Sequence, residues 1–344
     1  MRPVPAFDKL SVLLHPPRVH AYRFSVAPMM ERTDRHFRAL ARAVSKRCLL
    51  YTEMVMGRAV LSGRAERDLA FDPAELPLVM QVGDNDPGRL AQCARIAQDR
   101  GFTELNLNCG CPSSAVRDGA FGARLMMEPG RVADAVAAMK GACSLPVTVK
   151  HRIGVDELDR YEDMLRFVDV VTEAGCDAFI VHARKAWLHG LSPKENRNVP
   201  PLRPQDVHRL KRERPSLRIE LNGGIESSDA VVAALEHDDA VDGVMVGRAI
   251  YRDPLAFADV DARVYGDPEP AVTTEHVLET MLEHTRRWVE GGGRVHDVSR
   301  HIHGLFLGRP GGRKARRVLA EAGAGADLST LRRAAGMLNA DRTP

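Results

Sequence analysis

The sequence has no long apolar run. Hydrophobic residues make up 44% and charged residues 28% of its 344 residues, but no stretch approaches the roughly 20 apolar residues that cross a bilayer. The first 23 residues also lack the apolar core of a secretory signal. We therefore expect a cytoplasmic protein that has no membrane partner.

Cysteine is scarce and shows no paired spacing. Six cysteines stand at positions 48, 93, 109, 111, 143 and 176, without a CxxC pair. A zinc site or a disulfide framework needs closely spaced, paired cysteines. We therefore expect no bound metal, and reduced thiols that lie mostly in the core.

Between residues 24 and about 260, eight short runs rich in Val, Ile and Leu alternate with longer amphipathic stretches. Strands joined by helices must be parallel, and eight such units fit a closed (β/α)8 TIM barrel. A doubly wound open sheet is the alternative, but no GxGxxG motif follows the first run. The expected strands are Phe24–Met29, Cys48–Met54, Leu78–Val82, Glu104–Asn108, Val147–His151, Ala178–His182, Arg218–Asn222 and Gly243–Val246.

The pattern changes to helices alone after Gly266. We expect an N-terminal extension over residues 1–22, the barrel over 23–265 and a small helical domain over 266–344. From Arg286 to Arg317 there are nine Arg or Lys against two acidic residues. Such an excess suits a polyanion, although a charge run is usually a solvated helix face.

Polar residues stand at the carboxyl end of nearly every expected strand. In a (β/α)8 barrel these ends converge on one face, where active sites are built. Core packing would favour apolar residues there, so the set predicts an active site. Its members are Pro28, Met29, Glu53, Gln81, Asn108 to Cys111, Lys150, His182, Asn222 to Gly224, Gly247 and Arg248.

Two glycine-containing strand ends predict a phosphate site. Asn222-Gly223-Gly224 follows the seventh expected strand, and Gly247-Arg248 follows the eighth. Glycines let backbone N–H groups approach an anion, and the loops after these two strands often hold a phosphate in such barrels. A pair of ordinary tight turns is the alternative.

Lys150 and Cys111 carry the chemistry that we expect at this face. A lysine at the end of an apolar strand needs a counter-charge, and beside a flavin it can stabilise negative charge on the reduced ring. A thiol with a pKa of about 8.5 is mostly protonated at neutral pH and can deliver a proton. The alternative for Cys111 is a small buried hydrophobe, and for His182 a core histidine.

Several motifs together are specific to one family. They are Ser25-Val26-Ala27-Pro28-Met29-Met30, Tyr51-Thr52-Glu53-Met54, Gln81-Val82-Gly83, Asn106-Leu107-Asn108-Cys109-Gly110-Cys111-Pro112-Ser113, Val149-Lys150-His151-Arg152, Val181-His182-Ala183-Arg184 and Lys185-Ala186-Trp187-Leu188-His189-Gly190-Leu191-Ser192-Pro193-Lys194-Glu195-Asn196-Arg197. With them, the chain resembles the tRNA-dihydrouridine synthases over about residues 23 to 310, and most closely the subfamily that acts on uridines 20 and 20a.

The resemblance implies FMN as the cofactor and NADPH as the reductant. It implies Cys111 as the catalytic proton donor. Residues implied to contact FMN are Pro28, Met29, Met30, Gln81, Lys150, His182, Asn222, Gly223, Gly224, Gly247 and Arg248. Residues implied to contact tRNA are Asn108, Arg184, Lys194, Arg197 and Arg300.

The implied reaction reduces the C5=C6 bond of uridine in the tRNA D-loop to 5,6-dihydrouridine. Hydride passes from N5 of reduced FMN to C6, and Cys111 protonates C5, after the base has left its stack. We expect a monomer with tRNA as its partner. The alternatives are an FMN barrel reductase of a small enone or free pyrimidine, which would not need a basic helical domain, and a flavin-free RNA-binding protein.

Overall fold

The strands form one parallel sheet. The computed structural model describes residues 22–113 and 119–340, so the expected extension over residues 1–22 lies outside it except for Tyr22. Every strand pairing in the sheet is parallel, as the alternation with helices predicted. The strands are β1 (Phe24–Val26), β2 (Leu50–Tyr51), β3 (Val55–Met56), β4 (Leu78–Gly83), β5 (Glu104–Cys109), β6 (Val147–Arg152), β7 (Ala178–His182), β8 (Ile219–Asn222) and β9 (Gly243–Val246).

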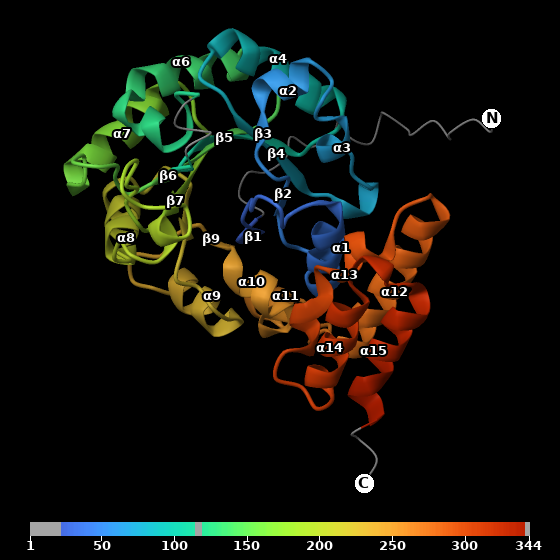
Figure 1. The fold of residues 1–344 in the computed structure, drawn as a ribbon. Helices are drawn as coiled ribbons and strands as arrows, with labels where there is room; N and C mark the ends of the chain where they lie inside the picture. The colour runs from blue at the N-terminus through green and yellow to red at the C-terminus, as the bar shows by residue number, and fades with distance from the viewer. Residues whose placement is uncertain (1–21, 114–118, 341–344) are drawn as a thin grey trace.

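The sheet closes into a barrel. Its strand order is β1-β9-β8-β7-β6-β5-β4-β2, with β3 beside β4. The two ends meet where Val26 donates its N–H to the carbonyl of Leu49 at 2.9 Å and Leu49 donates to the carbonyl of Phe24 at 3.0 Å. Figure 1 shows the ring of strands surrounded by helices. The predicted (β/α)8 fold is confirmed.

Two helices of the barrel show how the sequence marks a helix start with a capping side chain. The Asp86 carboxylate accepts the N–H of Arg89 at 2.7 Å, and proline occupies the first position of α4. Ser227 caps α9 through the N–H of Ala230. The helices are α1 (Arg35–Val44), α2 (Gly57–Leu61), α3 (Glu66–Leu69), α4 (Pro87–Asp99), α6 (Pro129–Lys140), α7 (Tyr161–Glu173), α8 (Pro204–Glu213), α9 (Ser228–Leu235), α10 (Arg248–Arg252) and α11 (Val260–Tyr265).

The barrel interior is layered. Because side chains alternate along a strand, every second residue points inward. An apolar layer made of Ala27, Leu49, Tyr51, Val79, Ile180 and Met245 fills the middle. Near the amino ends of the strands, called here the barrel floor, Arg218 pairs with Glu220 at 2.9 Å. Near the carboxyl ends, called here the barrel mouth, polar side chains take over.

Helices alone follow the barrel, as predicted. They are α12 (Thr274–Glu290), α13 (Val295–Ser299), α14 (Gly312–Ala322) and α15 (Leu328–Ala340), and Figure 1 shows them beside α1. Between α13 and α14 lies a 3-10 turn, Ile302–Phe306. A boundary at residue 266 stays a prediction. None of the described helices is both long enough and apolar enough to cross a membrane.

One carboxylate joins the barrel to the helices over residues 274–340, called here the helical region. Asp34 caps α1 by accepting the N–H groups of His36 and Phe37 at 2.9 and 3.1 Å. It also accepts hydrogen bonds from Arg300 at 2.5 Å and from His301 at 3.1 Å. Although burial opposes it, the His301 contact lowers the pKa of Asp34 below its usual range. This carboxylate therefore stays charged at neutral pH.

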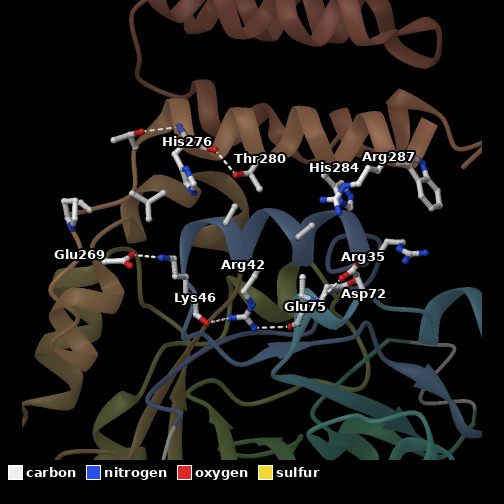
Figure 2. Close-up of a pocket in the computed structure, with 18 residues that line it drawn as sticks. Arg35, Arg42, Lys46, Asp72, Glu75, Glu269, His276, Thr280, His284 and Arg287 are labelled. Carbon is white, nitrogen blue, oxygen red and sulfur yellow. Dashed lines mark hydrogen bonds and ion pairs between the residues drawn. The ribbon is translucent and has the colours of Figure 1, made fainter. Parts of the chain in front are cut away.

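A cavity of about 670 Å³ lies between α1 and α12. Figure 2 shows His276, Thr280 and His284 of α12 facing α1, where Ala39 and Ala43 leave space. Lys46 and Glu269 form an ion pair of 2.5 Å at one end. None of the residues predicted for FMN or tRNA lines this cavity, so its size does not make it the candidate active site.

Candidate active site

The predicted strand-end residues come together at the barrel mouth. A second, smaller cavity is lined there by nine of the eleven residues expected to contact FMN. These nine are Pro28, Met29, Lys150, His182, Asn222, Gly223, Gly224, Gly247 and Arg248. Gly110, Arg152 and Arg197 line it too. Residues that are up to 220 positions apart in the sequence therefore share one site.

The other two expected FMN residues lie at different depths. Met30 is 55% exposed on the loop between β1 and α1, outside the lining of the cavity. Gln81 is buried beneath the mouth, where its Nε2 donates to Asn106 at 2.8 Å and its Oε1 accepts from Asn108 at 2.9 Å. Their contact with a flavin stays a prediction.

Lys150 is held in place by a neutral partner. Its Nζ donates to Oδ1 of Asn222 at 3.0 Å, and Nδ2 of Asn222 donates to the carbonyl of Met245 at 2.9 Å. Burial and the nearby Arg152 lower the pKa of Lys150 to about 7. An anion placed beside Lys150 would raise that pKa again, because opposite charge favours the ammonium form.

The cavity is rich in cations that lack carboxylate partners among the described residues. Burial and the neighbouring charges, chiefly Arg152 and Lys150, lower the pKa of His182 well below its usual value, so its imidazole is neutral. Within the part of the chain that the structure describes, Arg248 donates to two neutral groups, the side-chain amide of Asn198 at 2.6 Å and the carbonyl of Arg197 at 3.0 Å. Glu226 lines the cavity but pairs with Arg252. This balance suits an anionic ligand.

Two glycines open the space that such a ligand needs. Gly223 and Gly224 have φ values of +108° and +79°, which side-chain-bearing residues rarely adopt. A Cβ on Gly223 would lie 3.0 Å from the His182 ring, and a Cβ on Gly224 would lie 2.9 Å from Leu202. The residues present therefore fit the phosphate of a flavin mononucleotide.

Cys111 lies on the segment that leaves β5, next to this cavity. Its side chain is half-buried, and its Sγ lies 3.4 Å from the Ser113 hydroxyl oxygen. The Asn108 Oδ1 accepts the N–H groups of Gly110 and Cys111 at 3.1 and 3.0 Å. The backbone that carries the thiol is thus held by hydrogen bonds, and the thiol lies near Lys150 and Arg152.

Asn108 belongs to a chain of side-chain hydrogen bonds across β4, β5 and β6. The chain runs from Asn108 to Gln81, from Gln81 to Asn106, and from Asn106 to Thr148 at 2.8 Å. Since its oxygen holds the Cys111 segment and its amide group holds Gln81, Asn108 orients its neighbours. Its expected contact with tRNA stays a prediction.

The remaining residues expected to contact tRNA are spread around the mouth. Arg197 lines the cavity, and Arg184 donates to the carbonyl oxygens of Asn198 and Pro200. Lys194 is exposed on the loop after β7. Arg300 lies outside the lining of the cavity, in the helical region, and donates to Asp34, the N-cap of α1.

Two residues outside the predicted set organise the site. Arg152 is 4% exposed and lines the cavity, while Asn196 is fully buried in the loop after β7. The alternation Lys150-His151-Arg152 places Arg152 on the inner face with Lys150, so its position, though not its role, follows from the sequence. Asn196 lies within the family motif over residues 185–197, but no periodic pattern gives it a structural role.

Comparison with known proteins agrees with this geometry. The family model described as Dihydrouridine synthase (Dus) matches residues 25–335. The chain is 50% identical over 297 residues to the tRNA-dihydrouridine(20/20a) synthase of Synechocystis sp., covering 86% of this chain and 88% of the relative. It is 47% identical over 315 residues to the protein of that name from Escherichia coli strain K12, covering 91% and 90%. The chain therefore belongs to the dihydrouridine synthase family, a family of oxidoreductases.

Proposed function

We propose that this protein reduces the C5=C6 bond of uridine at positions 20 and 20a of the tRNA D-loop, using FMN and NADPH. The observation that carries the proposal is the pairing of a rim thiol, Cys111, with a cation-rich cavity at the ends of β7, β8 and β9. Relatives about 50% identical carry the name of this activity.

Different groups would hold the phosphate and the ring of the cofactor. The backbone of Gly223 and Gly224 and the guanidinium of Arg248 would hold the phosphate, with His182 as a neutral partner. Lys150 would face the ring and stabilise its negative charge. When bound, FMN supplies the hydride that C6 of uracil receives.

Cys111 completes the addition across the double bond. As C6 gains a hydride, negative charge develops at C5 and on the carbonyl oxygen conjugated with it. The Cys111 thiol donates its proton to C5, and the resulting thiolate takes up a proton from solvent. The Ser113 hydroxyl, 3.4 Å from Sγ, can donate a hydrogen bond to that thiolate.

The exposed cations would bind the RNA around this point. The uracil must leave its stack to reach the barrel mouth, and phosphate contacts hold the strand while it does so. Lys194 and Arg197 are suited to this on the loop after β7, and Arg300 on the helical region. Arg184 lies near enough to the mouth to orient the base.

The test replaces one cysteine at a time. In Cys111→Ala we expect FMN reduction by NADPH to persist and dihydrouridine formation to fall at least about 100-fold, the usual contribution of a positioned acid. Cys143→Ala is the matched control, since Cys143 is also half-buried but follows α6 outside the site. Both half-reactions are followed by flavin absorbance, and the product by nucleoside mass spectrometry.

Two results would count against the proposal. Equal dihydrouridine formation in Cys111→Ala and wild type would remove the thiol from its role. A purified wild-type protein that neither holds a flavin nor takes one up would favour the RNA-binding alternative.

A further inference from the structure

Arg152, the last residue of β6, is buried without an acid. It is 4% exposed, and it forms no ion pair with any carboxylate in the described part of the chain. Its ionisable neighbours are the Cys111 thiol and the cations Lys150, Arg184 and Arg197. Burying a charge this way is costly unless polar groups compensate it. The hydrogen-bond partners of Arg152 therefore indicate its role.

Those partners are backbone carbonyls from two separate segments. Nε donates to the carbonyl of Gly110 at 2.8 Å, beside Cys111. Nη1 donates to the carbonyls of Lys185 and Asn196 at 2.9 and 3.1 Å, on the loop after β7. One planar guanidinium therefore connects the thiol segment to that loop.

The contact with Gly110 acts on the peptide unit that precedes the thiol. The carbonyl of Gly110 and the N–H of Cys111 belong to the same planar group. Arg152 binds its oxygen and the Asn108 side chain binds its nitrogen at 3.0 Å. With both ends held, this peptide is restrained on the amino side of Cys111. On the carboxyl side the Cys111 carbonyl accepts the N–H of Ala123 at 2.9 Å, so the backbone that directs the thiol is held from both sides.

The loop at the other end is itself rigid. The buried side chain of Asn196 accepts the N–H of Trp187 at 2.8 Å and donates to the carbonyls of Trp187 and Leu191 at 2.9 and 3.2 Å. Residues 187–196 thus form one closed unit, called here the 187–196 loop. It carries the exposed Lys194 and is followed by Arg197.

We propose that Arg152 is a positioning residue that fixes the Cys111 thiol relative to the 187–196 loop, so that RNA bound on this loop is presented to a correctly placed proton donor. The inference rests on the proposed function, because it assigns Arg152 to the protonation step. Lysine cannot replace it, since one ammonium group cannot span three carbonyls that arginine reaches from two nitrogens.

The test isolates the step on tRNA. The flavin of the holoenzyme is reduced chemically, tRNA is added, and flavin reoxidation is followed in a single turnover. We expect Arg152→Lys and Arg152→Ala to lower this rate about 10- to 100-fold, as a misplaced catalytic group does, with the dissociation constant for tRNA changed less than about threefold. Guanidinium ion should partly restore Arg152→Ala, and ammonium ion should not.

A second readout reports the thiol directly. Without tRNA, the rate at which iodoacetamide alkylates Cys111, measured on its peptide by mass spectrometry, should change in both variants because the Gly110–Cys111 peptide is released. Arg218→Lys is the matched control: Arg218 is 7% exposed at the barrel floor, and its loss should leave both readouts as in wild type.

The possible results distinguish a failure of the role proposed for Arg152 from a failure of the proposed function. Wild-type single-turnover and alkylation rates in Arg152→Lys would overturn the positioning role. So would an effect confined to the tRNA dissociation constant, which would make Arg152 a simple phosphate contact. If wild-type enzyme with reduced flavin fails to reduce tRNA at all, the proposed function fails instead. If Arg152→Ala does not fold, Arg152→Lys and its alkylation rate still decide.

Discussion

The two ends of the barrel treat buried charge in opposite ways. At the floor, Arg218 pairs with Glu220, and the Ser25 hydroxyl donates to the same carboxylate at 3.1 Å. Burial and the nearby Glu220 raise the pKa of Glu104 to about 8, so this second acid is mostly neutral at physiological pH. At the mouth, Lys150 and Arg152 have only neutral partners among the described residues.

The difference shows how structural charge can be told from functional charge. A charge that serves only the fold is neutralised inside the fold, because an uncompensated buried ion is destabilising. The floor meets that condition and needs no ligand. The mouth does not meet it, and its excess of cations is best explained by an anion that arrives from outside.

The largest effect should come from removing a cation at the barrel mouth. In Lys150→Gln we expect the FMN dissociation constant to rise roughly 10- to 100-fold, the value of a charge-assisted hydrogen bond. Fluorescence titration of the apoprotein with FMN measures it. Lys211→Gln is the control, since Lys211 pairs with Asp242 at 2.8 Å on the floor side. Equal FMN affinity in both variants would show that the cation excess is not a cofactor site.

A smaller effect should follow from filling the glycine-lined space. Gly223→Ala should weaken FMN binding about tenfold, because its Cβ would press on the His182 ring at 3.0 Å in a strained backbone. Gly101→Ala carries a similar strain at φ +82° with nothing within 4 Å. It should lose stability but keep FMN affinity. If both variants lose stability alike and bind FMN alike, the space around Gly223 is not used.

The stability contributed by the barrel floor should depend on pH, whereas catalysis should not depend on the floor. Because the folded pKa of Glu104 is raised to about 8, the native state binds the extra proton, and its contribution to stability falls as pH rises from about 4.5 to about 8. In Glu104→Gln this loss, roughly 5 kcal/mol, should disappear from urea unfolding curves, with dihydrouridine formation unchanged. A variant that keeps the wild-type pH dependence would place the titration elsewhere.

Most of the fold follows from the sequence because period and composition are local signals. The errors occur where single side chains compete with the backbone. The second strand was expected over Cys48–Met54 but ends at Tyr51, since the Thr52 hydroxyl accepts the N–H of Gln81 at 3.1 Å in place of a ladder partner. The first strand, expected to Met29, ends at Val26, shortly before Pro28, which has no N–H to donate.

The residues of the site that stand at strand ends could be predicted from the sequence. Nine expected cofactor residues line one cavity because alternation and the barrel fold together bring inward-facing strand ends to one face. The same rule places Arg152 on this face, although its contacts with two backbone segments could not be predicted. The role of Asn196 could not be predicted either, because it depends on the path of a loop, and no periodic pattern encodes that path.

Asp34 has a consequence for communication within the molecule. It caps α1, five residues after Met29 of the cavity, and the same carboxylate accepts hydrogen bonds from Arg300 and His301 of the helical region. If an incoming phosphate displaced Arg300, Asp34 would lose one hydrogen bond, and the first turn of α1 that Asp34 caps could shift. By thermodynamic reciprocity, whatever factor RNA exerts on cofactor affinity through this joint, the cofactor must exert on RNA affinity.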